Sequence, residues 1–192
     1  MPRVGVLALQ GDVREHVAML HAIGVTGELI KRPEQLEGLD GIIFPGGEST
    51  TMAHLLATSG LQLALEERVA NGLPVLGTCA GLILLSHKVL DGRDQQWSLR
   101  ALDVIVRRNG YGRQIASFES PVDVKGVGVV PGVFIRAPRI EAWGKDVEVL
   151  AKLDHGDGPH PVLVRQGAIW GCSFHPELTN DSWLHQMFTS SL

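Results

Sequence analysis

The sequence predicts an α/β fold: a three-layer, open and mostly parallel sheet with helices on both faces and an antiparallel β extension. Short apolar runs alternate with helical patterns through the first half of the 192-residue chain. The run at 3–10 is continuously apolar, which is typical of a parallel strand covered on both faces. The second half consists of β-rich pieces separated by turn residues, which favours antiparallel pairing.

The first half is expected to contain strands and helices in alternation. The strands are expected at 3–10, 26–33, 39–47 and 73–79, of which the one at 26–33 is short. The helices are the segments with apolar residues at helical spacing, at 12–24, 49–60, 61–72 and 80–90. Asp12 is the candidate N-cap of the first helix and Gly24 its stop. Right-handed crossovers between the strands would place these helices on both faces of the sheet.

The second half is expected to extend this sheet. Its β-rich pieces lie at 101–114, 120–138, 146–153, 160–166 and 168–177. They could form an antiparallel extension plus returning strands, and a helix at 181–192 would close the chain. Because the sequence shows no internal repeat, low-complexity tract or linker, we expect one domain over residues 1–192.

Composition excludes several classes of function. The formal net charge is -4 and no segment is strongly basic, which argues against a nucleic-acid partner. No apolar run approaches the roughly 20 residues of a membrane span, so no membrane partner is expected. The N-terminal run lacks the features of a signal peptide, and two cysteines make no disulfide framework. We therefore expect a cytoplasmic protein, with Cys172 in a buried strand and His16 at the surface or hydrogen-bonded.

Cys79 lies where the strand at 73–79 meets the following helix. The surrounding GTCAG has the pattern G-x-C-x-G, the cysteine version of the nucleophile elbow. This strained turn needs glycines where Cβ atoms would clash, and the helix N-terminus favours a thiolate. The backbone N–H of Ala80 is a candidate donor to an oxyanion. From this motif alone, a small buried core cysteine is an equally good interpretation.

The segment SFHPEL supplies a candidate base for such a nucleophile. His175 follows an apolar strand, so it also lies at a strand end. Pro176 keeps His175 extended, and residues two apart in an extended chain share a face. Glu177 is therefore placed to orient the imidazole, as the acid of a catalytic triad does.

The segment FPGGEST supplies a second candidate oxyanion donor. It too ends an apolar strand and precedes a helix. Gly46 and Gly47 let the backbone approach a ligand closely, so their amides are candidates for the other half of an oxyanion hole. The alternative is an ordinary turn in which Ser49 or Thr50 caps the helix. Because three strand ends converge on one edge of the sheet, the catalytic interpretation is favoured.

Cys79 in GTCAG, followed much later by HPE, resembles the class I, or triad-type, glutamine amidotransferases. Other segments resemble the family of glutaminase subunits of pyridoxal 5′-phosphate synthase: GVLALQGDVREH, KRPEQL, PGGESTTM, GTCAGLILL, RNGYGRQ, GVFIRAP and GCSFHPELT. The resemblance implies hydrolysis of L-glutamine to L-glutamate and ammonia. Cys79 would form a γ-glutamyl thioester, His175 would act as general base and then acid, and Glu177 would orient His175.

The resemblance also implies a glutamine-binding set: Gly47, Glu48, Ser49, Arg108, Ile135 and Arg136. Either arginine suits the substrate carboxylate and Glu48 suits its amino group, but the pairing stays open. Gln10, which ends the first strand at the same edge, is a possible further contact to the site or to a partner. This chemistry needs no cofactor and no metal.

A partner follows from the chemistry and from the resemblance. Ammonia is mostly protonated at neutral pH and then no longer nucleophilic, which favours a docked synthase and a closed path. The family's partner is a (β/α)₈-barrel subunit that makes pyridoxal 5′-phosphate from ribose 5-phosphate and glyceraldehyde 3-phosphate, in an assembly of twelve synthase and twelve glutaminase subunits. The family's glutaminase is weak until docked, and the Gly46–Gly47 peptide is our candidate for the part that docking sets.

Three alternative functions compete with this interpretation. The nearest is the glutaminase subunit of another ammonia-channelling enzyme, such as imidazole glycerol phosphate synthase, from which PGGESTTM and VFIRAP distinguish the chain. A second is the chaperone or peptidase branch of the fold, which typically carries His directly after the nucleophile, where this chain has Ala80. A third is a non-enzymatic binding subunit, against which the complete set of Cys79, His175 and Glu177 argues.

Overall fold

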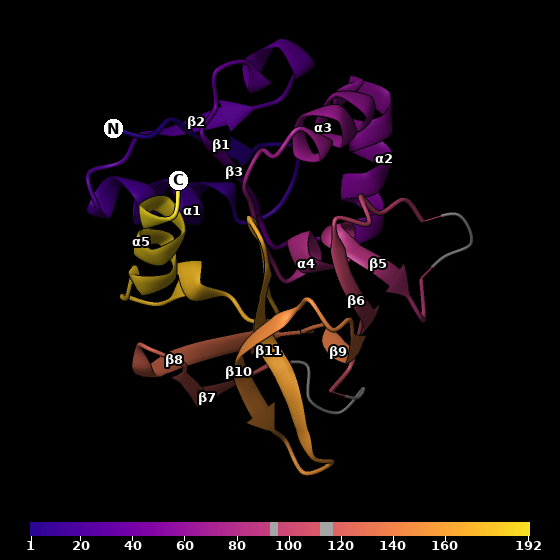
Figure 1. Cartoon of the computed structure of the whole chain (residues 1–192), viewed down its shortest axis with the longest axis vertical. Coiled ribbons are helices and arrows are strands. Elements are labelled where there is room, and N and C mark those ends of the chain that lie inside the picture. The colour runs from indigo at the N-terminus through magenta and orange to yellow at the C-terminus, as the bar shows by residue number, and fades with distance from the viewer. Residues whose placement is uncertain (93–95, 112–116) are drawn as a thin grey trace.

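The computed structural model of the chain describes residues 1–92, 96–111 and 117–192. A nine-stranded sheet runs through the molecule in the order β2-β1-β3-β4-β12-β11-β10-β7-β8 (Figure 1). Its strands are β1 (Val4–Leu7), β2 (Gly27–Ile30), β3 (Gly41–Phe44), β4 (Val75–Thr78), β7 (Ser117–Val124), β8 (Gly128–Ile135), β10 (Glu148–Asp154), β11 (Pro159–Gln166) and β12 (Ile169–Cys172). A smaller sheet has the order β5-β6-β9 and contains β5 (Ser86–Val89), β6 (Leu102–Arg107) and β9 (Arg139–Trp143).

The parallel part of the large sheet consists of β2, β1, β3, β4 and β12. Every residue of β1, β3, β4 and β12 is buried, as the continuous apolar runs predicted. Successive residues serve opposite faces: Val75 belongs to one hydrophobic cluster and Leu76 to the other. The four strands predicted in the first half all form.

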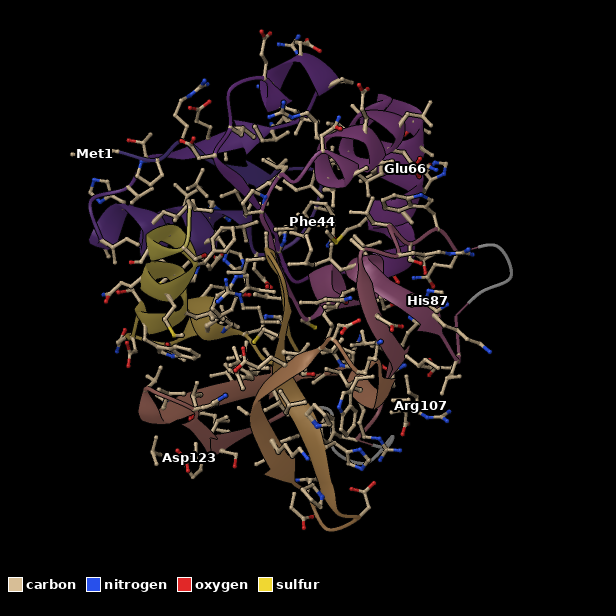
Figure 2. All side chains as sticks on the ribbon, viewed as in Figure 1. Met1, Phe44, Glu66, His87, Arg107 and Asp123 are labelled. Atoms are coloured by element: carbon tan, nitrogen blue, oxygen red, sulfur yellow. The ribbon has the colours of Figure 1, made fainter. Side chains whose placement is uncertain are left out.

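Helices cover both faces of this parallel part (Figure 1). The first face carries α1 (Val13–Ala22) and α5 (Trp183–Ser190), and the second carries α2 (Ser49–Ser59), α3 (Leu61–Ala70) and α4 (Ala80–Leu85). Figure 2 shows Phe44 of β3 in the interior between these layers, whereas Met1 and Asp123 lie at the periphery. The predicted layered α/β fold is therefore confirmed. None of the helices in the described ranges is long and apolar enough to cross a membrane.

Beyond β12 the sheet continues as the antiparallel strands β11, β10, β7 and β8, which confirms the predicted extension. Burial alternates along β8, where Val130 and Phe134 are buried and Val129 is exposed. This alternation is that of a strand with one face on a core. The last residue of β8 is Ile135. It lies at the edge of the sheet where β4 and β12 end.

One predicted helix is shorter than expected. The pattern at 80–90 predicted a single helix, but α4 ends at Leu85 and β5 begins at Ser86. Ser86 is extended, and its hydroxyl donates to the Ile83 carbonyl at 2.8 Å, which closes the last turn. β5 then pairs in parallel with β6, so a partner later in the chain overrides the local helical pattern. Of the piece at 101–114, β6 forms, while residues 112–114 lie outside the described ranges.

Candidate active site

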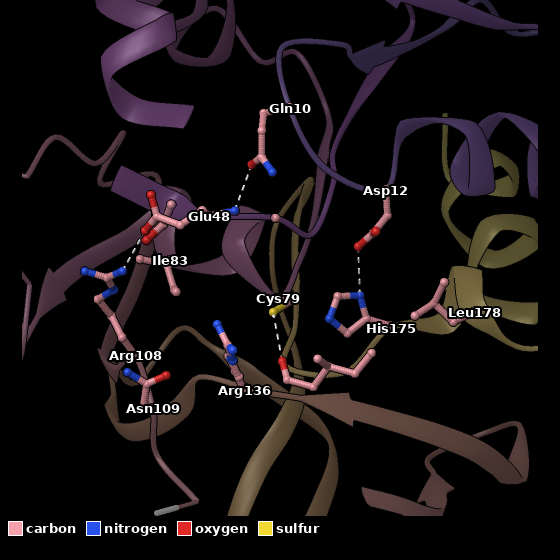
Figure 3. Close-up of a pocket in the computed structure, with 13 residues that line it drawn as sticks. Gln10, Asp12, Glu48, Cys79, Ile83, Arg108, Asn109, Arg136, His175 and Leu178 are labelled. Atoms are coloured by element: carbon pink, nitrogen blue, oxygen red, sulfur yellow. Dashed lines mark hydrogen bonds and ion pairs between the residues drawn. The ribbon is translucent and has the colours of Figure 1, made fainter. Parts of the chain in front are cut away.

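The candidate site lies at the carboxyl ends of the adjacent parallel strands β1, β3, β4 and β12. Gln10 follows β1, Gly46 follows β3, Cys79 follows β4 and His175 follows β12. A cavity of about 540 Å³ opens at this edge, where open α/β sheets bind their ligands (Figure 3). Its lining residues are Gln10, Asp12, Gly47, Glu48, Ser49, Cys79, Ile83, Arg108, Asn109, Ile135, Arg136, His175 and Leu178.

Cys79 stands on a strained turn between β4 and α4. Its φ of 48° and ψ of -104° lie in a region that non-glycine residues rarely adopt. Such a conformation costs about 1–3 kcal/mol and persists only where the surroundings enforce it. Here the Cys79 N–H donates to the Cys172 carbonyl at 2.8 Å, and the Cys79 carbonyl accepts from the Ile83 N–H at 3.3 Å. The turn therefore has the strain and position that the elbow motif predicted.

The glycines on either side of Cys79 leave no room for a side chain. A Cβ on Gly77 would lie 2.6 Å from Leu85 Cδ1 and 2.7 Å from the carbonyl carbon of Gly81. A Cβ on Gly81 would overlap the carbonyl oxygen of Phe44. The close approach of β3, β4 and α4 thus explains why this turn has the pattern G-x-C-x-G.

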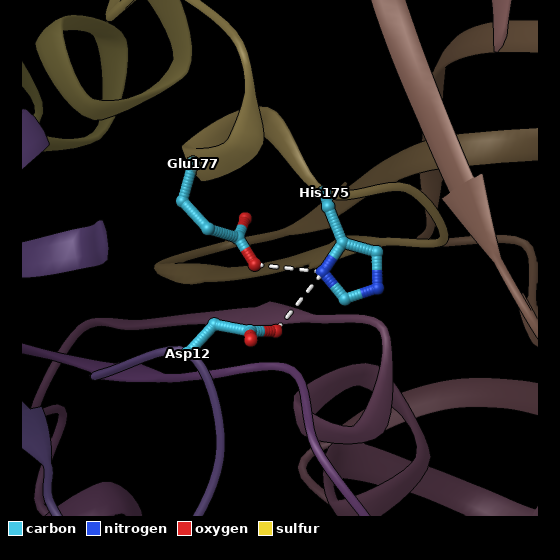
Figure 4. Close-up of side chains that lie close together, drawn as sticks. All are labelled: Asp12, His175 and Glu177. Carbon is cyan, nitrogen blue, oxygen red and sulfur yellow. Dashed lines mark hydrogen bonds and ion pairs between the residues drawn. The ribbon is translucent and has the colours of Figure 1, made fainter. Parts of the chain in front are cut away.

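His175 is buried between two carboxylates (Figure 4). Its Nδ1 lies 2.8 Å from Oε1 of Glu177 and 3.3 Å from Oδ2 of Asp12. Burial lowers the pKa of this imidazole, but the neighbouring Asp12, Cys79 and Glu177 outweigh burial and raise the pKa to about 12. The surroundings therefore favour an imidazolium, the form that results when His175 takes the proton of a thiol.

The other ring nitrogen of His175 is the one available to the candidate nucleophile Cys79. Nε2 is buried and has no hydrogen-bond partner among the described residues. In Figure 3 this nitrogen is turned away from Asp12, toward the side where Cys79 lies. The Cys79 thiol lies 3.8 Å from the carbonyl oxygen of Ile135, a weak hydrogen bond that holds Sγ at the cavity wall. The site thus pairs an oriented imidazole with a thiol that lines the same cavity.

The glycine pair after β3 packs against the candidate base. The carbonyl of Gly46 accepts a hydrogen bond from the Asp12 N–H at 3.1 Å. Because the peptide bond between Gly46 and Gly47 is trans, its N–H points opposite to the Gly46 carbonyl, and so away from Asp12. A Cβ on Gly46 would overlap the His175 ring and lie 2.7 Å from Oδ2 of Asp12. Only glycine fits position 46 in this geometry.

Glu48 and Arg108 form the charged wall of the cavity. The Glu48 carboxylate accepts from the N–H groups of Thr50 at 3.1 Å and Thr51 at 2.7 Å, and Nη2 of Arg108 donates to it at 2.8 Å. Burial raises the pKa of Glu48, but the hydrogen bonds from Thr51 and Thr50 outweigh burial and lower the pKa to about 2. The Glu48 N–H donates to Oε1 of Gln10 at 2.8 Å. A fixed anion and a fixed cation therefore lie side by side.

One group among the described residues has the composition of a metal site. Asp12, His175 and Glu177 each offer a ligand atom, and these atoms lie within 4.8 Å of one another. The histidine atom involved is Nδ1, which lies at hydrogen-bond distance from Glu177. A shared proton on Nδ1 accounts for this arrangement without an ion.

A model described as the SNO glutamine amidotransferase family matches residues 6–192. The chain belongs to this family. It is 52% identical to a Streptomyces avermitilis protein named pyridoxal 5′-phosphate synthase subunit PdxT, covering 97% of this chain and 92% of the relative. A protein of the same name from Thermotoga maritima is 50% identical, and the match covers 97% of each chain.

Solved structures support the amidotransferase fold. A crystal structure of a glutamine amidotransferase is 48% identical to this chain and superposes with a TM-score of 0.91, covering 98% of this chain and 97% of the other. The structure of PurLQS from Thermotoga maritima is 14% identical, with a TM-score of 0.71 and 99% of each chain covered, and therefore shows likeness of fold alone. The predicted fold class and family are thus confirmed.

The amidotransferase cavity brings together most residues that the sequence singled out. Its wall includes Cys79, His175, Gln10 and all six predicted glutamine-binding residues. Glu177 is buried behind His175, and the candidate oxyanion donor Ala80 begins α4 directly after Cys79. The oxyanion role of Gly46, Gly47 and Ala80 stays a prediction. Residues 112–114 of the segment RNGYGRQ lie outside the described part of the chain.

One prediction about helix caps held in position only, and one alternative about a cap was wrong; both corrections bear on the cavity. Asp12 occupies the N-cap position of α1, but its side chain makes no capping hydrogen bond and turns to His175 instead. Glu48, and neither Ser49 nor Thr50, caps α2. Four lining residues were missed: Asp12, Ile83, Asn109 and Leu178. For Asp12 a signal was present, because it follows Gln10 by two residues at the same strand end.

A pair of buried histidines in this amidotransferase lies behind Glu177. Nδ1 of His16 lies 2.9 Å from Nε2 of His185, while Nε2 of His16 lies 3.0 Å from the Thr78 hydroxyl and 3.5 Å from Oε1 of Glu177. Burial lowers the pKa of His16 well below its usual range and that of His185 to about 4, so both rings are neutral at pH 7. His16 is hydrogen-bonded, which was one of the two expected alternatives, but its place beside Glu177 was not predicted.

We expect this pair to make the fold less stable as the pH falls from about 6.5 to about 4. Histidine in the unfolded chain titrates near 6.5, whereas His185 titrates at about 4 when folded, so the unfolded state binds the proton first. The stabilisation is therefore complete above this window and lost as the pH falls through it. Urea midpoints at pH 7 and pH 5 measure this loss.

The variant His185→Gln should show a smaller pH dependence of the urea midpoint than the wild type. The matched variant His21→Gln removes an exposed histidine of α1 and should leave that dependence unchanged. Equal pH dependence in the wild type and in His185→Gln would show that the buried ring is not held neutral.

Proposed function

We propose that this family member hydrolyses L-glutamine to L-glutamate and ammonia, and delivers the ammonia to a partner synthase that makes pyridoxal 5′-phosphate. Residues 1–192 would act as a single glutaminase domain. The observation that carries the proposal is the placement of Cys79 and the Glu177-bound His175 in one cavity, at the carboxyl edge of the sheet. The relatives named PdxT, 52% and 50% identical over 97% of the chain, support this pathway over that of imidazole glycerol phosphate.

The first half of the proposed reaction forms a thioester. Sγ of Cys79 attacks the side-chain amide carbon of glutamine, and the thiol proton passes to Nε2 of His175. The amide oxygen becomes negative and is stabilised by the N–H groups of Gly47 and Ala80. Ala80 is the first residue of α4, where an N–H has no acceptor within the helix. The carbon–nitrogen bond then breaks, His175 gives its proton to the leaving nitrogen, and ammonia departs.

The second half of the reaction hydrolyses the γ-glutamyl thioester. His175 takes a proton from water, and the resulting hydroxide attacks the thioester carbon. The carbon–sulfur bond breaks, the imidazolium returns a proton to the departing sulfur, and glutamate leaves. Throughout both halves Glu177 holds Nδ1 protonated, which leaves Nε2 as the nitrogen that exchanges protons with the reacting groups.

The charged wall of the cavity fits the head group of glutamine. An amino acid carries an ammonium and a carboxylate on one carbon, and Glu48 and Arg108 present an anion and a cation 2.8 Å apart. We propose that Glu48 binds the ammonium and Arg108 the carboxylate. Gly47, Ser49 and Ile135 would line the path of the substrate side chain, with Arg136 at the exposed rim.

Arg108→Gln is therefore expected to raise the KM for glutamine at least about tenfold, since a charge-assisted hydrogen bond contributes roughly 1.5–3 kcal/mol. The effect on kcat should be smaller, because the head group is remote from the reacting amide. The matched variant Arg136→Gln should raise KM less, since this side chain is exposed. Glutamate release at varied glutamine concentrations measures both. A larger rise for Arg136→Gln would assign the carboxylate to Arg136.

The proposed partner is a (β/α)₈-barrel synthase subunit, with twelve copies of each chain in the full assembly. The relatives' name, synthase subunit, supports a multi-subunit enzyme. We propose that docking sets the Gly46–Gly47 peptide, whose carbonyl is held by the Asp12 N–H in the isolated chain. We further propose a cytoplasmic location, because the reaction requires Cys79 as a free thiol.

The function is tested by mixing the chain with a candidate synthase subunit and following pyridoxal 5′-phosphate formation from the two sugar phosphates. Glutamine should support product formation only when this chain is present, whereas an ammonium salt should support it with the synthase alone. If ammonium salt supports the product and glutamine does not, the pathway assignment is wrong. Glutamate release measured in the same mixture separates a failed glutaminase from a wrong partner.

A further inference from the structure

His175 has one carboxylate more than a triad requires. A single N–H on Nδ1 faces both Oε1 of Glu177 at 2.8 Å and Oδ2 of Asp12 at 3.3 Å (Figure 4). The two acids approach from different parts of the chain, since Glu177 follows β12 and Asp12 follows β1. They also differ in surroundings, because the Glu177 side chain is fully buried and that of Asp12 is 33% exposed at the cavity.

The position of Asp12 is held from both sides. Its backbone N–H donates to the Gly46 carbonyl at 3.1 Å, and its side chain makes no capping bond to α1 that would account for it otherwise. One helical turn later, the buried ring of His16 bonds to Thr78 and His185. Because residues four apart share a helix face, the bonds of His16 hold the start of α1, and with it Asp12, next to His175. The contact between Asp12 and His175 is therefore fixed by the packing around it.

We propose that Asp12 is a second carboxylate partner of His175, a positioning residue that shares the Nδ1 proton with Glu177 and stabilises the imidazolium formed when His175 takes the thiol proton. This role rests on the proposed glutaminase function. It follows from Coulomb attraction at short range: an anion 3.3 Å from Nδ1 favours the charged ring over the neutral one. The glutamine-bound site would then keep a negative charge beside the base even when Glu177 is altered.

The first test needs neither substrate nor partner. Iodoacetamide alkylates the thiolate, and mass spectrometry assigns the adduct to Cys79 or Cys172. The groups that face His175 are Asp12, Glu177 and the Cys79 thiol, with neutral His16 behind Glu177. Because Asp12 lies against the cationic end of the thiolate–imidazolium pair, Asp12→Asn should raise the pH at which Cys79 alkylation is half-maximal by about 1–2 units.

The matched variant for this test is Glu15→Gln. It also removes one negative charge from the first turn of α1, where Glu15 is the acidic residue. Its alkylation profile should follow that of the wild type. If Asp12→Asn and Glu15→Gln give the same midpoint, Asp12 does not act on the base and the proposal is overturned. This result would leave the glutaminase assignment untouched, because the readout does not use glutamine.

The second test asks whether Asp12 acts through the same proton as Glu177. In the complex with the synthase, Asp12→Asn alone should lower kcat for glutamate release about threefold, with KM unchanged. In the Glu177→Gln background, the same change should lower kcat at least about thirtyfold, because Asp12 is then the remaining carboxylate. Equal factors in both backgrounds would mean a purely structural role. Thermal midpoints are measured for each variant, and if Glu177→Gln does not fold, the alkylation profiles decide.

Discussion

Cys79→Ala is expected to lower glutamate release from glutamine at least about a thousandfold in the complex with the synthase. The thioester cannot form without Sγ, and the remaining groups can only bind glutamine and stabilise its oxyanion. Alanine should fit the strained backbone at position 79 as well as cysteine does, because the Cβ of both residues is unbranched. The loss should therefore appear in kcat with little change in thermal stability.

Cys172→Ala serves as the matched variant for this prediction. Cys172 is fully buried in β12, its thiol lies 3.3 Å from the Phe174 carbonyl, and burial raises the pKa of the thiol well above its usual value. An inert thiol of this kind should be replaceable with near-normal turnover. A comparable loss in Cys172→Ala, or unchanged release in Cys79→Ala, would show that the nucleophile was assigned to the wrong thiol.

Gly46→Ala is expected to lower kcat at least about a hundredfold, because misplacement of a reacting group by about 1 Å has that effect. The added methyl would overlap the His175 ring and lie 2.7 Å from Oδ2 of Asp12. Either the imidazole moves from its position between the two carboxylates, or the loop after β3 moves and takes Gly47 with it. Both displacements act on the reaction, and steady-state kinetics with glutamine measure the result.

Gly27→Ala is the matched variant for the glycine at position 46. Its added Cβ would lie 3.1 Å from Leu20 Cδ1 and 3.3 Å from Val17 Cγ2, which are side-chain carbons and leave more room than the ring and carboxylate at position 46. We expect a modest change in thermal midpoint and normal kinetics. If Gly46→Ala also keeps normal kinetics, the glycine is not needed for the position of the base.

Much of the parallel half was predictable because each of its strands is marked by a short apolar segment of the local sequence. A continuous apolar run such as GIIF at 41–44 has few ways to bury itself other than as a strand covered on both faces. The candidate site followed from the same logic, since residues placed directly after such runs meet at one edge of the sheet. Cys79, His175 and the Gly46–Gly47 pair were found in this way, and the structure places them around one cavity.

The missed features depend on contacts between distant parts of the chain. α4 ends at Leu85 because β5 pairs with β6, a partner that the pattern at 80–90 does not encode. Asp12 has the residue type and position of a helix cap, and only the arrival of His175 beside it shows that its side chain is used elsewhere. The sequence around His16 likewise gives no sign of its role, because its partner His185 lies far along the chain. Local patterns predict elements, whereas such side-chain roles require the packed structure.

The most direct test of the account is to look for the covalent intermediate itself. The complex is mixed with glutamine, quenched with acid during turnover and digested, and the peptides that contain Cys79 and Cys172 are compared by mass. The account predicts a γ-glutamyl group on the Cys79 peptide, absent without glutamine and absent in Cys79→Ala. Glutamate release without any adduct on Cys79, or an adduct on Cys172, would contradict it.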